Sequence, residues 1–123
     1  ANRTRPRADA LRADFGAKVH VHEFVQAGNL LEDAVTVINT TSLGMTGKAD
    51  FRIPLDKLNP QALCNDLVYT PLKTQFLIEA EAQGATIVDG LGMLLHQAAP
   101  GFERWFGTRP EVDEATRKAV LSA

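Results

Sequence analysis

The sequence predicts an α/β domain that is built on a parallel β-sheet. Short apolar segments alternate with segments of helical spacing, and short connections join them. Polar or glycine-containing stretches follow three of the apolar segments directly, at residues 40–45, 66–70 and 89–93. Ligands of such sheets bind outside the carboxyl ends of the strands, so these stretches predict one binding site at that edge.

Length and composition are those of a single globular domain. The 123 residues include 45% hydrophobic and 23% charged residues, and the net charge of -2 gives no general attraction to nucleic acid or to an anionic membrane. The single cysteine, Cys64, excludes an internal disulfide, which fits a reducing cytoplasm. The histidines lack a carboxylate or cysteine at ligand spacing, so no metal site is predicted. Because the chain begins at Ala1, without Met, we expect it to be part of a longer protein.

Four elements are predicted in the first half of the chain. The spacing of Ala8, Leu11 and Phe15 indicates a helix, with Thr4 as its N-cap and Gly16 at its end. Apolar and histidine residues then alternate, and a β-branched segment follows that is typical of a parallel strand buried on both faces. The expected elements are a helix at 5–15, a strand at 19–24, a short helix at 30–33 and a strand at 35–39.

The second half continues this alternation after an irregular stretch at residues 46–60. The expected elements are a strand at 62–69, a helix at 72–83, a strand at 86–89, a long helix at 91–106 and a final helix at 112–121. We expect the three later strands to pair in chain order, with the helices at 72–83 and 91–106 covering the sheet.

A cluster of arginine residues lies at the start of the first predicted helix. The segment Asn2-Arg3-Thr4-Arg5-Pro6-Arg7 surrounds a helix N-terminus with guanidinium groups. Helix N–H groups, the helix dipole and arginine side chains all bind anions, so this cluster suits a phosphate. In a dinucleotide-binding fold, an arginine after the second strand suits the ribose phosphate of NADP, whereas an acid suits NAD. The alternative is a solvated, basic helix start.

Side chains of the first two edge loops are candidate ligand contacts. Thr40, Thr41 and Ser42 offer hydroxyl groups to a ribose or diphosphate, or alternatively cap the following turn. Tyr69, the only tyrosine, either contacts a ligand or is a half-buried ring whose hydroxyl is in water. Lys73 is better explained as a solvated helix residue than as a catalytic lysine.

The third edge loop opens the long helix and contains two glycines. Gly90 and Gly92 allow a tight turn and the close approach of a flat ligand, toward which the helix N–H groups point. Gln97 is placed to reach such a ligand, unless it is simply exposed. Met93 either contacts the ligand or fills the core.

These motifs resemble those of the NADP-dependent shikimate dehydrogenases. Residues 2–8 match the family pattern NRTxxRA without a mismatch, and residues 89–99 match DGLGMLxxQAA. Residues 37–45 and 66–74 are similar to (I/V)NxTxxGM and DxxYxPxxT, with Thr70 where the family often has Asn. The resemblance extends over nearly the whole chain and covers only the carboxyl-terminal half of such an enzyme.

The resemblance implies a Rossmann-like, doubly wound fold and a role for each motif. Residues 1–123 would be the partial carboxyl-terminal NADP-binding domain of a two-domain dehydrogenase, lacking the first strand and the glycine-rich loop of that domain. The residues expected to bind NADP are Asn2, Arg3, Thr4, Arg7, Thr40, Thr41, Ser42, Leu67, Gly90 and Met93. Those expected to bind shikimate are Tyr69 and Gln97. Arg5 falls at a variable position of the motif and is expected to be solvated.

The implied activity is reversible hydride transfer between NADPH and the C3 carbonyl of 3-dehydroshikimate, which gives shikimate in chorismate and aromatic amino-acid biosynthesis. The family's catalytic lysine and aspartate belong to an amino-terminal substrate domain, so no catalytic residue is expected in this chain. We expect the chain alone to self-associate through an open sheet edge or to have low stability, and to lack dehydrogenase activity.

Three alternatives remain open. A quinate/shikimate dehydrogenase of relaxed specificity would share the fold, although Arg3 and Arg7 favour NADP over NAD. A domain that binds NADP without catalysis would lack the catalytic pair in the parent protein. A nucleic-acid-binding domain is the weakest alternative, because no aromatic residues are interleaved with the basic cluster.

Overall fold

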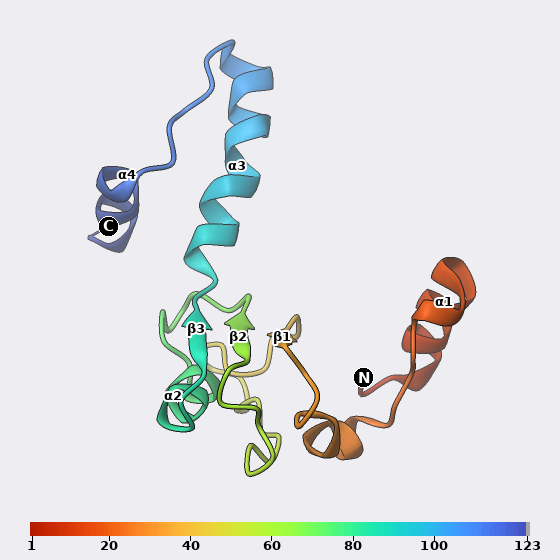
Figure 1. The fold of residues 1–123 in the computed structure, drawn as a ribbon. Helices are drawn as coiled ribbons and strands as arrows, with labels where there is room; N and C mark the ends of the chain where they lie inside the picture. The colour runs from red at the N-terminus through yellow and green to blue at the C-terminus, as the bar shows by residue number, and fades with distance from the viewer. Residues whose placement is uncertain (123) are drawn as a thin grey trace.

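A three-stranded parallel sheet forms the centre of the computed structural model, which describes residues 1–122 (Figure 1). The strands are β1 (Thr36–Asn39), β2 (Leu63–Asp66) and β3 (Thr86–Val88), and they lie in that order. Asn39 stands opposite Asp66 at the ends of the first pair of strands. The predicted order and direction of the strands are confirmed, and all three carboxyl ends meet at one edge.

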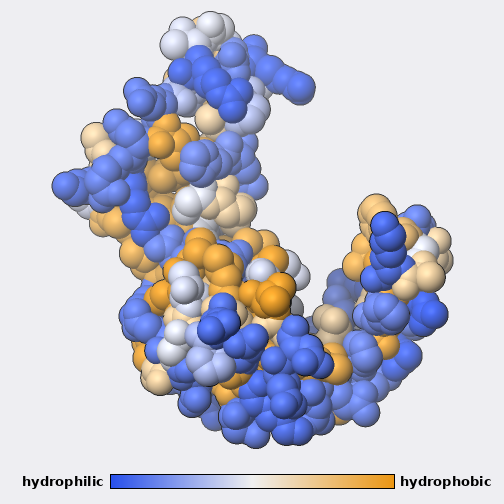
Figure 2. All heavy atoms as spheres, in the orientation of Figure 1, coloured by the Kyte–Doolittle hydropathy of each residue, from blue (hydrophilic) through white to orange (hydrophobic). Residues whose placement is uncertain are grey.

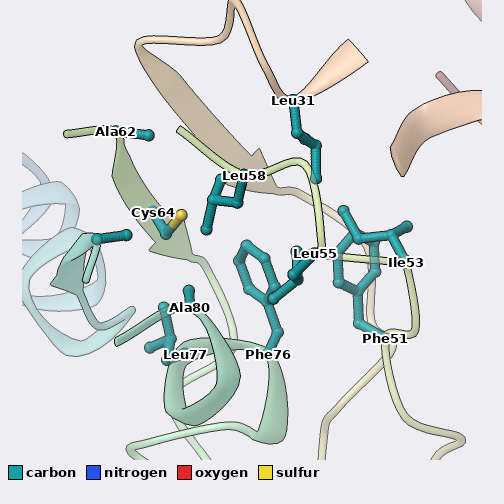
Figure 3. Packing of buried hydrophobic residues seen from close by; sticks show 11 residues of the cluster. Leu31, Phe51, Ile53, Leu55, Leu58, Ala62, Cys64, Phe76, Leu77 and Ala80 are labelled. Carbon is teal, nitrogen blue, oxygen red and sulfur yellow. The ribbon is translucent and has the colours of Figure 1, made fainter. Parts of the chain in front are cut away.

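A hydrophobic core lies between the sheet, helix α2 (Gln75–Ala82) and the irregular segment at residues 51–58. Figure 3 shows Phe76 of α2 lying between Cys64 of β2 and Leu55 of this segment. The ring of Phe76 packs edge-on against Phe51, with the ring centres 5.1 Å apart. Burying a side chain of this size contributes about 1.5–3 kcal/mol. The cluster comprises Leu31, Phe51, Ile53, Leu55, Leu58, Ala62, Cys64, Phe76, Leu77, Ala80 and Ala85.

The opposite face of the sheet is not covered, which corrects the expectation of strands buried on both faces. Ile38 of β1 is 53% exposed and Val88 of β3 is 42% exposed. Helix α3 (Leu91–Phe106) extends away from the carboxyl edge instead of packing over the sheet (Figure 1). The prediction that this helix covers the sheet is therefore wrong, although its bounds are confirmed.

The amino-terminal segment forms an arm beside the sheet. Helix α1 (Arg5–Phe15) has the predicted bounds, and Gly16 ends it with a φ of 80°, a conformation that glycine adopts without strain. Thr4 occupies the N-cap position, but its side chain makes no capping hydrogen bond. The predicted strand at 19–24 is wrong, because this segment pairs with no strand of the described residues.

Two short 3₁₀ helices replace the elements expected between α1 and β1. Helix η1 spans Gly16–Lys18 and helix η2 spans Phe24–Leu30. The short helix expected at 30–33 is therefore displaced toward the amino terminus. The ring of Phe24 in η2 lies 5.9 Å from that of Phe51, which attaches the arm to the core.

The carboxyl-terminal part consists of α3 and helix α4 (Glu114–Leu121). Gly107 ends α3 with a φ of 74°, and Asp113 caps α4 by accepting a hydrogen bond of 2.8 Å from the Thr116 N–H. Hydrogen bonding to Thr116 lowers the pKa of Asp113.

Helix α2 begins three residues later than predicted, since Thr74 is its N-cap. Within residues 1–122, no helix combines the length and the apolar character that crossing a membrane requires.

Apolar side chains remain exposed on both extended parts. In Figure 2 hydrophobic residues gather along α3 and over the adjoining end of the sheet, and an open space separates this body from α1. Trp105 and Phe106 at the end of α3, and Phe15 at the end of α1, are among the most exposed. Such surfaces are typical of regions that another part of a protein covers.

Candidate functional site

The three polar loops that follow the strands lie together at the carboxyl edge, as the sequence predicts. The N–H of Thr46 donates a hydrogen bond of 2.9 Å to the carbonyl of Thr70, which joins the first loop to the second. The backbone of Gly90, in the third loop, packs against Leu67 in the second. One edge of the sheet therefore presents all three loops to a ligand.

Asn39 shapes the first loop from a buried position at the end of β1, where it is only 1% exposed. Its side-chain oxygen accepts hydrogen bonds from the Thr41 N–H (3.0 Å) and the Thr41 hydroxyl (2.8 Å). Its side-chain nitrogen donates to the carbonyl of Leu43 (3.0 Å) and to Asp66 (3.0 Å). These bonds fix the backbone that carries the candidate contacts Thr40 and Ser42.

Asp66 fixes the second loop by hydrogen bonds, as Asn39 fixes the first, and it is fully buried. Its carboxylate accepts hydrogen bonds from the Val68 N–H (2.9 Å) and from the Thr74 hydroxyl (2.7 Å), in addition to Asn39. Thr74 in turn caps α2 by accepting from the Leu77 N–H. A buried carboxylate is tolerated only when it is hydrogen-bonded in this way.

Asn39, Asp66 and Thr74 therefore form one hydrogen-bonded network beneath the loops. None of the three is among the predicted site residues. Two signals were present in the sequence: a polar residue ends each of two apolar strands, and the aspartate and threonine belong to the pattern at 66–74. Their role is to position the loops.

Gly90 allows the third loop to pack closely against the second. A Cβ atom at this position would lie 2.4 Å from the carbonyl oxygen of Leu67 and 2.7 Å from that of Val68. The φ of Gly90 is -79°, so the requirement is for space and not for backbone freedom. At Gly92 nothing of the described chain lies within 4 Å of a built Cβ atom, so the structure gives a packing reason for glycine at Gly90 alone, and the approach of a ligand to both glycines stays a prediction.

The arginine cluster and the first loop line one cavity of about 270 Å³. Arg3 and Arg7 are exposed, and neither pairs with a carboxylate within residues 1–122. Arg5 is exposed, as expected, and it forms an ion pair with Glu23 at the surface, whose hydrogen bond raises the pKa of Arg5. The lining residues are Ala1, Asn2, Arg3, Thr4, Arg7, Phe24, Thr40, Thr41, Ser42 and Leu43. Two motifs that are distant in the sequence thus share one concave site, which carries two cations that have no ion-pair partner among the described residues.

The remaining predicted contacts lie at the other end of the edge. Leu67 and Met93 are half-buried, and Tyr69 is 41% exposed. Gln97 is exposed on α3, about two helical turns beyond Gly90. The structure brings Leu67 against Gly90, but it places Gln97 further along the helix than the loops. Lys73 pairs with Glu81 on the surface, so it is engaged outside this edge.

Comparison with known proteins gives a consistent result. Residues 90–121 match the family model for the shikimate 5'-dehydrogenase C-terminal domain. Over all 123 residues the chain is 76% identical to a relative from Cereibacter sphaeroides (strain ATCC 17029 / ATH 2.4.9) that is named shikimate dehydrogenase (NADP(+)). The chain covers 44% of the length of that relative. Over its whole length the chain is therefore similar to the carboxyl-terminal part of shikimate dehydrogenases.

Solved structures of related dehydrogenases share the fold of this chain. Shikimate 5-dehydrogenase from Thermus thermophilus, in complex with NADP(H) and shikimate, is 33% identical with a TM-score of 0.74, over 89% of this chain and 40% of that one. Quinate dehydrogenase from Corynebacterium glutamicum, in complex with NAD, is 28% identical with a TM-score of 0.83, over 98% of this chain and 44% of that one. The predicted Rossmann-like α/β class is thereby confirmed.

The chain spans less than half the length of the shikimate dehydrogenase relatives that it matches. The roles of the individual residues at the edge of the sheet remain predictions.

Proposed function

We propose that the protein carrying this chain is a shikimate dehydrogenase that interconverts shikimate and 3-dehydroshikimate with NADP. In this proposal residues 1–123 form the carboxyl-terminal cofactor domain, and an additional domain supplies the groups that move the proton. The observation that carries the proposal is the cavity in which Arg3 and Arg7, neither of which pairs with a carboxylate of residues 1–122, meet the hydroxyl-rich loop after β1.

The arginine end of the edge suits the adenosine phosphate of NADP. Two guanidinium groups, those of Arg3 and Arg7, belong to residues that line the cavity, and such groups favour a dianionic phosphate. Asn2 and Thr4 would add hydrogen bonds, and the Thr4 N–H already donates to the Asn2 side chain at 2.8 Å. Arg5 is held by Glu23, so Arg3 and Arg7 are the residues that we assign to the phosphate.

The middle of the edge suits the ribose and diphosphate of the cofactor. Thr40, Thr41 and Ser42 line the same cavity as the arginines. Because Asn39 fixes the Thr41 backbone and hydroxyl, the loop is ordered before a ligand arrives. An ordered loop binds more tightly, since less conformational entropy is lost on binding.

The far end of the edge would receive the nicotinamide and the substrate. In the proposed reaction the bound cofactor accepts or donates the hydride at C3 of the substrate. Leu67, Gly90 and Met93 would hold the nicotinamide ring by apolar and backbone contact, while Tyr69 and Gln97 would donate hydrogen bonds to substrate oxygens. On this assignment the chain binds and orients the reactants, and it provides no general base.

A quinate dehydrogenase is the second candidate, because a solved quinate dehydrogenase shares this fold with a TM-score of 0.83. The arginine pair argues for NADP, whereas that structure is a complex with NAD. The 76% identity to a protein named shikimate dehydrogenase (NADP(+)) also favours shikimate.

The test is an assay of the full-length protein with shikimate or quinate and with NADP or NAD, measured by the absorbance of the reduced nicotinamide. We expect the highest kcat/KM with shikimate and NADP. A higher value with quinate would favour the second candidate. Tight binding of NADP without turnover of either acid would identify a binding domain without catalysis.

A further inference from the structure

An ion pair joins the last helix to the glycine turn at the edge of the sheet. The Arg117 guanidinium, on α4, donates to both carboxylate oxygens of Asp89, and the Nη1–Oδ1 distance is 3.2 Å. The two residues are 28 positions apart. Their side chains are only 27% and 24% exposed, and the hydrogen bond raises the pKa of Arg117. A two-point contact of this kind fixes orientation as well as distance.

Asp89 transmits this contact to the backbone of the turn. Its Oδ1 atom also accepts a hydrogen bond of 3.0 Å from the Leu91 N–H, the first residue of α3. Gly90 lies between these two residues and packs against the carbonyl groups of Leu67 and Val68. A displacement of the Asp89 carboxylate would therefore move the close contact between the second and third loops.

Helix α4 has little else to hold it against the rest of the chain. It buries none of its described side chains, and within residues 1–122 it packs against α3 alone among the helices and strands. The ion pair is also the contact that neutralises Asp89, a carboxylate directly before the turn.

We infer that Arg117 is a positioning residue for the reaction, which acts by holding Asp89 and thereby the Gly90 turn in the form that receives nicotinamide and substrate. The inference rests on the proposed function, because that function places the nicotinamide at this turn. It predicts that α4, although remote from the arginine cluster, controls turnover at the opposite end of the edge.

The test compares Arg117→Ala, Arg117→Lys and Asp89→Asn with Lys118→Ala in the full-length protein. Lys118 is the adjacent, exposed residue of α4 and pairs with no carboxylate of the described residues. We expect Arg117→Ala to lower kcat/KM for shikimate about 10- to 100-fold, because small displacements of reacting groups are costly. Arg117→Lys should recover part of the loss, since lysine keeps the charge without the two-point contact.

Two further measurements separate positioning from a general loss of structure. Adenosine 2′,5′-bisphosphate, a probe of the arginine end alone, should bind the Arg117 variants within about twofold of the unaltered protein. The double variant Asp89→Asn/Arg117→Ala should lose no more activity than the worse single variant, because the two residues act as one unit.

The inference is overturned if Arg117→Ala turns over shikimate as well as Lys118→Ala, or if it loses affinity for adenosine 2′,5′-bisphosphate to the same degree as activity. If the unaltered protein turns over no shikimate, the proposed function fails, and the inference fails with it. An active unaltered protein with an equally active Arg117→Ala variant contradicts the inference alone.

Discussion

The side-chain nitrogen of Asn39 donates a hydrogen bond of 3.0 Å to the carboxylate of Asp66, across the ends of two neighbouring parallel strands. Both residues are buried. Each also accepts a hydrogen bond from a backbone N–H group in the loop that follows its own strand. The strand register and the loop conformations are therefore linked by one polar contact. This contact orders the cofactor side of the edge from within the protein.

Replacement of Asp66 by Ala should destabilise the protein by about 3 kcal/mol. The change leaves the Asn39 amide, the Val68 N–H and the Thr74 hydroxyl without their shared acceptor in a buried place. Urea unfolding measures the loss as a lower midpoint at constant slope. The control is Asp56→Ala at an exposed position, which should change the stability by less than about 0.5 kcal/mol. Equal effects of the two changes would contradict the network.

Gly90 and Gly92 form a matched pair for testing close packing. Gly90→Ala should destabilise the protein by about 1–3 kcal/mol, because the new methyl group would overlap the carbonyl groups of Leu67 and Val68. Gly92→Ala has open space and lies in a helix, so it should be neutral or stabilise by up to about 1 kcal/mol. Thermal unfolding of both variants distinguishes them. A melting temperature for Gly90→Ala at or above that of Gly92→Ala would show that the loops are not packed as described.

Gln97→Ala should raise KM for shikimate about three- to tenfold and leave KM for NADP nearly unchanged. The reason is the loss of one hydrogen bond to a substrate oxygen, with no change at the arginine end. Steady-state kinetics of the full-length protein provides both constants. His96→Ala, at the neighbouring exposed position of α3, is the control and should change neither constant. An unchanged KM for shikimate in Gln97→Ala would mean that this side chain is only a surface residue.

Cys64 should resist alkylation in the folded protein. The side chain is buried in β2, and burial raises the pKa of its thiol by disfavouring the thiolate. An exposed cysteine is about half ionised near pH 8.5 and reacts with iodoacetamide, whereas Cys64 should remain a thiol at that pH. Mass spectrometry should find labelling only after urea is added. Rapid labelling without urea would contradict the described core.

The fold could be predicted where local patterns decide the structure. Helix α1 ends where Gly16 permits a positive φ, and α3 has the predicted bounds, because such signals are local in the sequence. The strand expected at 19–24 does not form, although apolar and polar residues alternate there in the sequence. A strand needs a neighbouring strand to pair with, and the alternation in the sequence cannot show whether one is present. The exposure of Ile38 was missed for a similar reason: whether a helix covers a strand is a tertiary property.

The candidate site could be predicted as a set of loops but not as a set of contacts. The motifs identified the three loops and their shared edge, since polar residues follow apolar strands. The bond between Asn39 and Asp66 and the pair of Asp89 with Arg117 join residues 27 and 28 positions apart, and no periodicity links them. The close packing at Gly90 also depends on a neighbouring loop, so a sequence pattern gives the glycine but not its reason.

The central claim is that Arg3 and Arg7 bind the phosphate that distinguishes NADP from NAD. The most direct measurement is calorimetric titration of the full-length protein and its Arg3→Gln/Arg7→Gln variant with NADPH and with NADH. We expect the variant to lose roughly 2–5 kcal/mol of binding free energy for NADPH and to bind NADH within about threefold of the unaltered protein. Arg12→Gln, on the same helix and without an ion pair among residues 1–122, should bind both cofactors normally. Equal losses for NADPH and NADH in the double variant would contradict the claim.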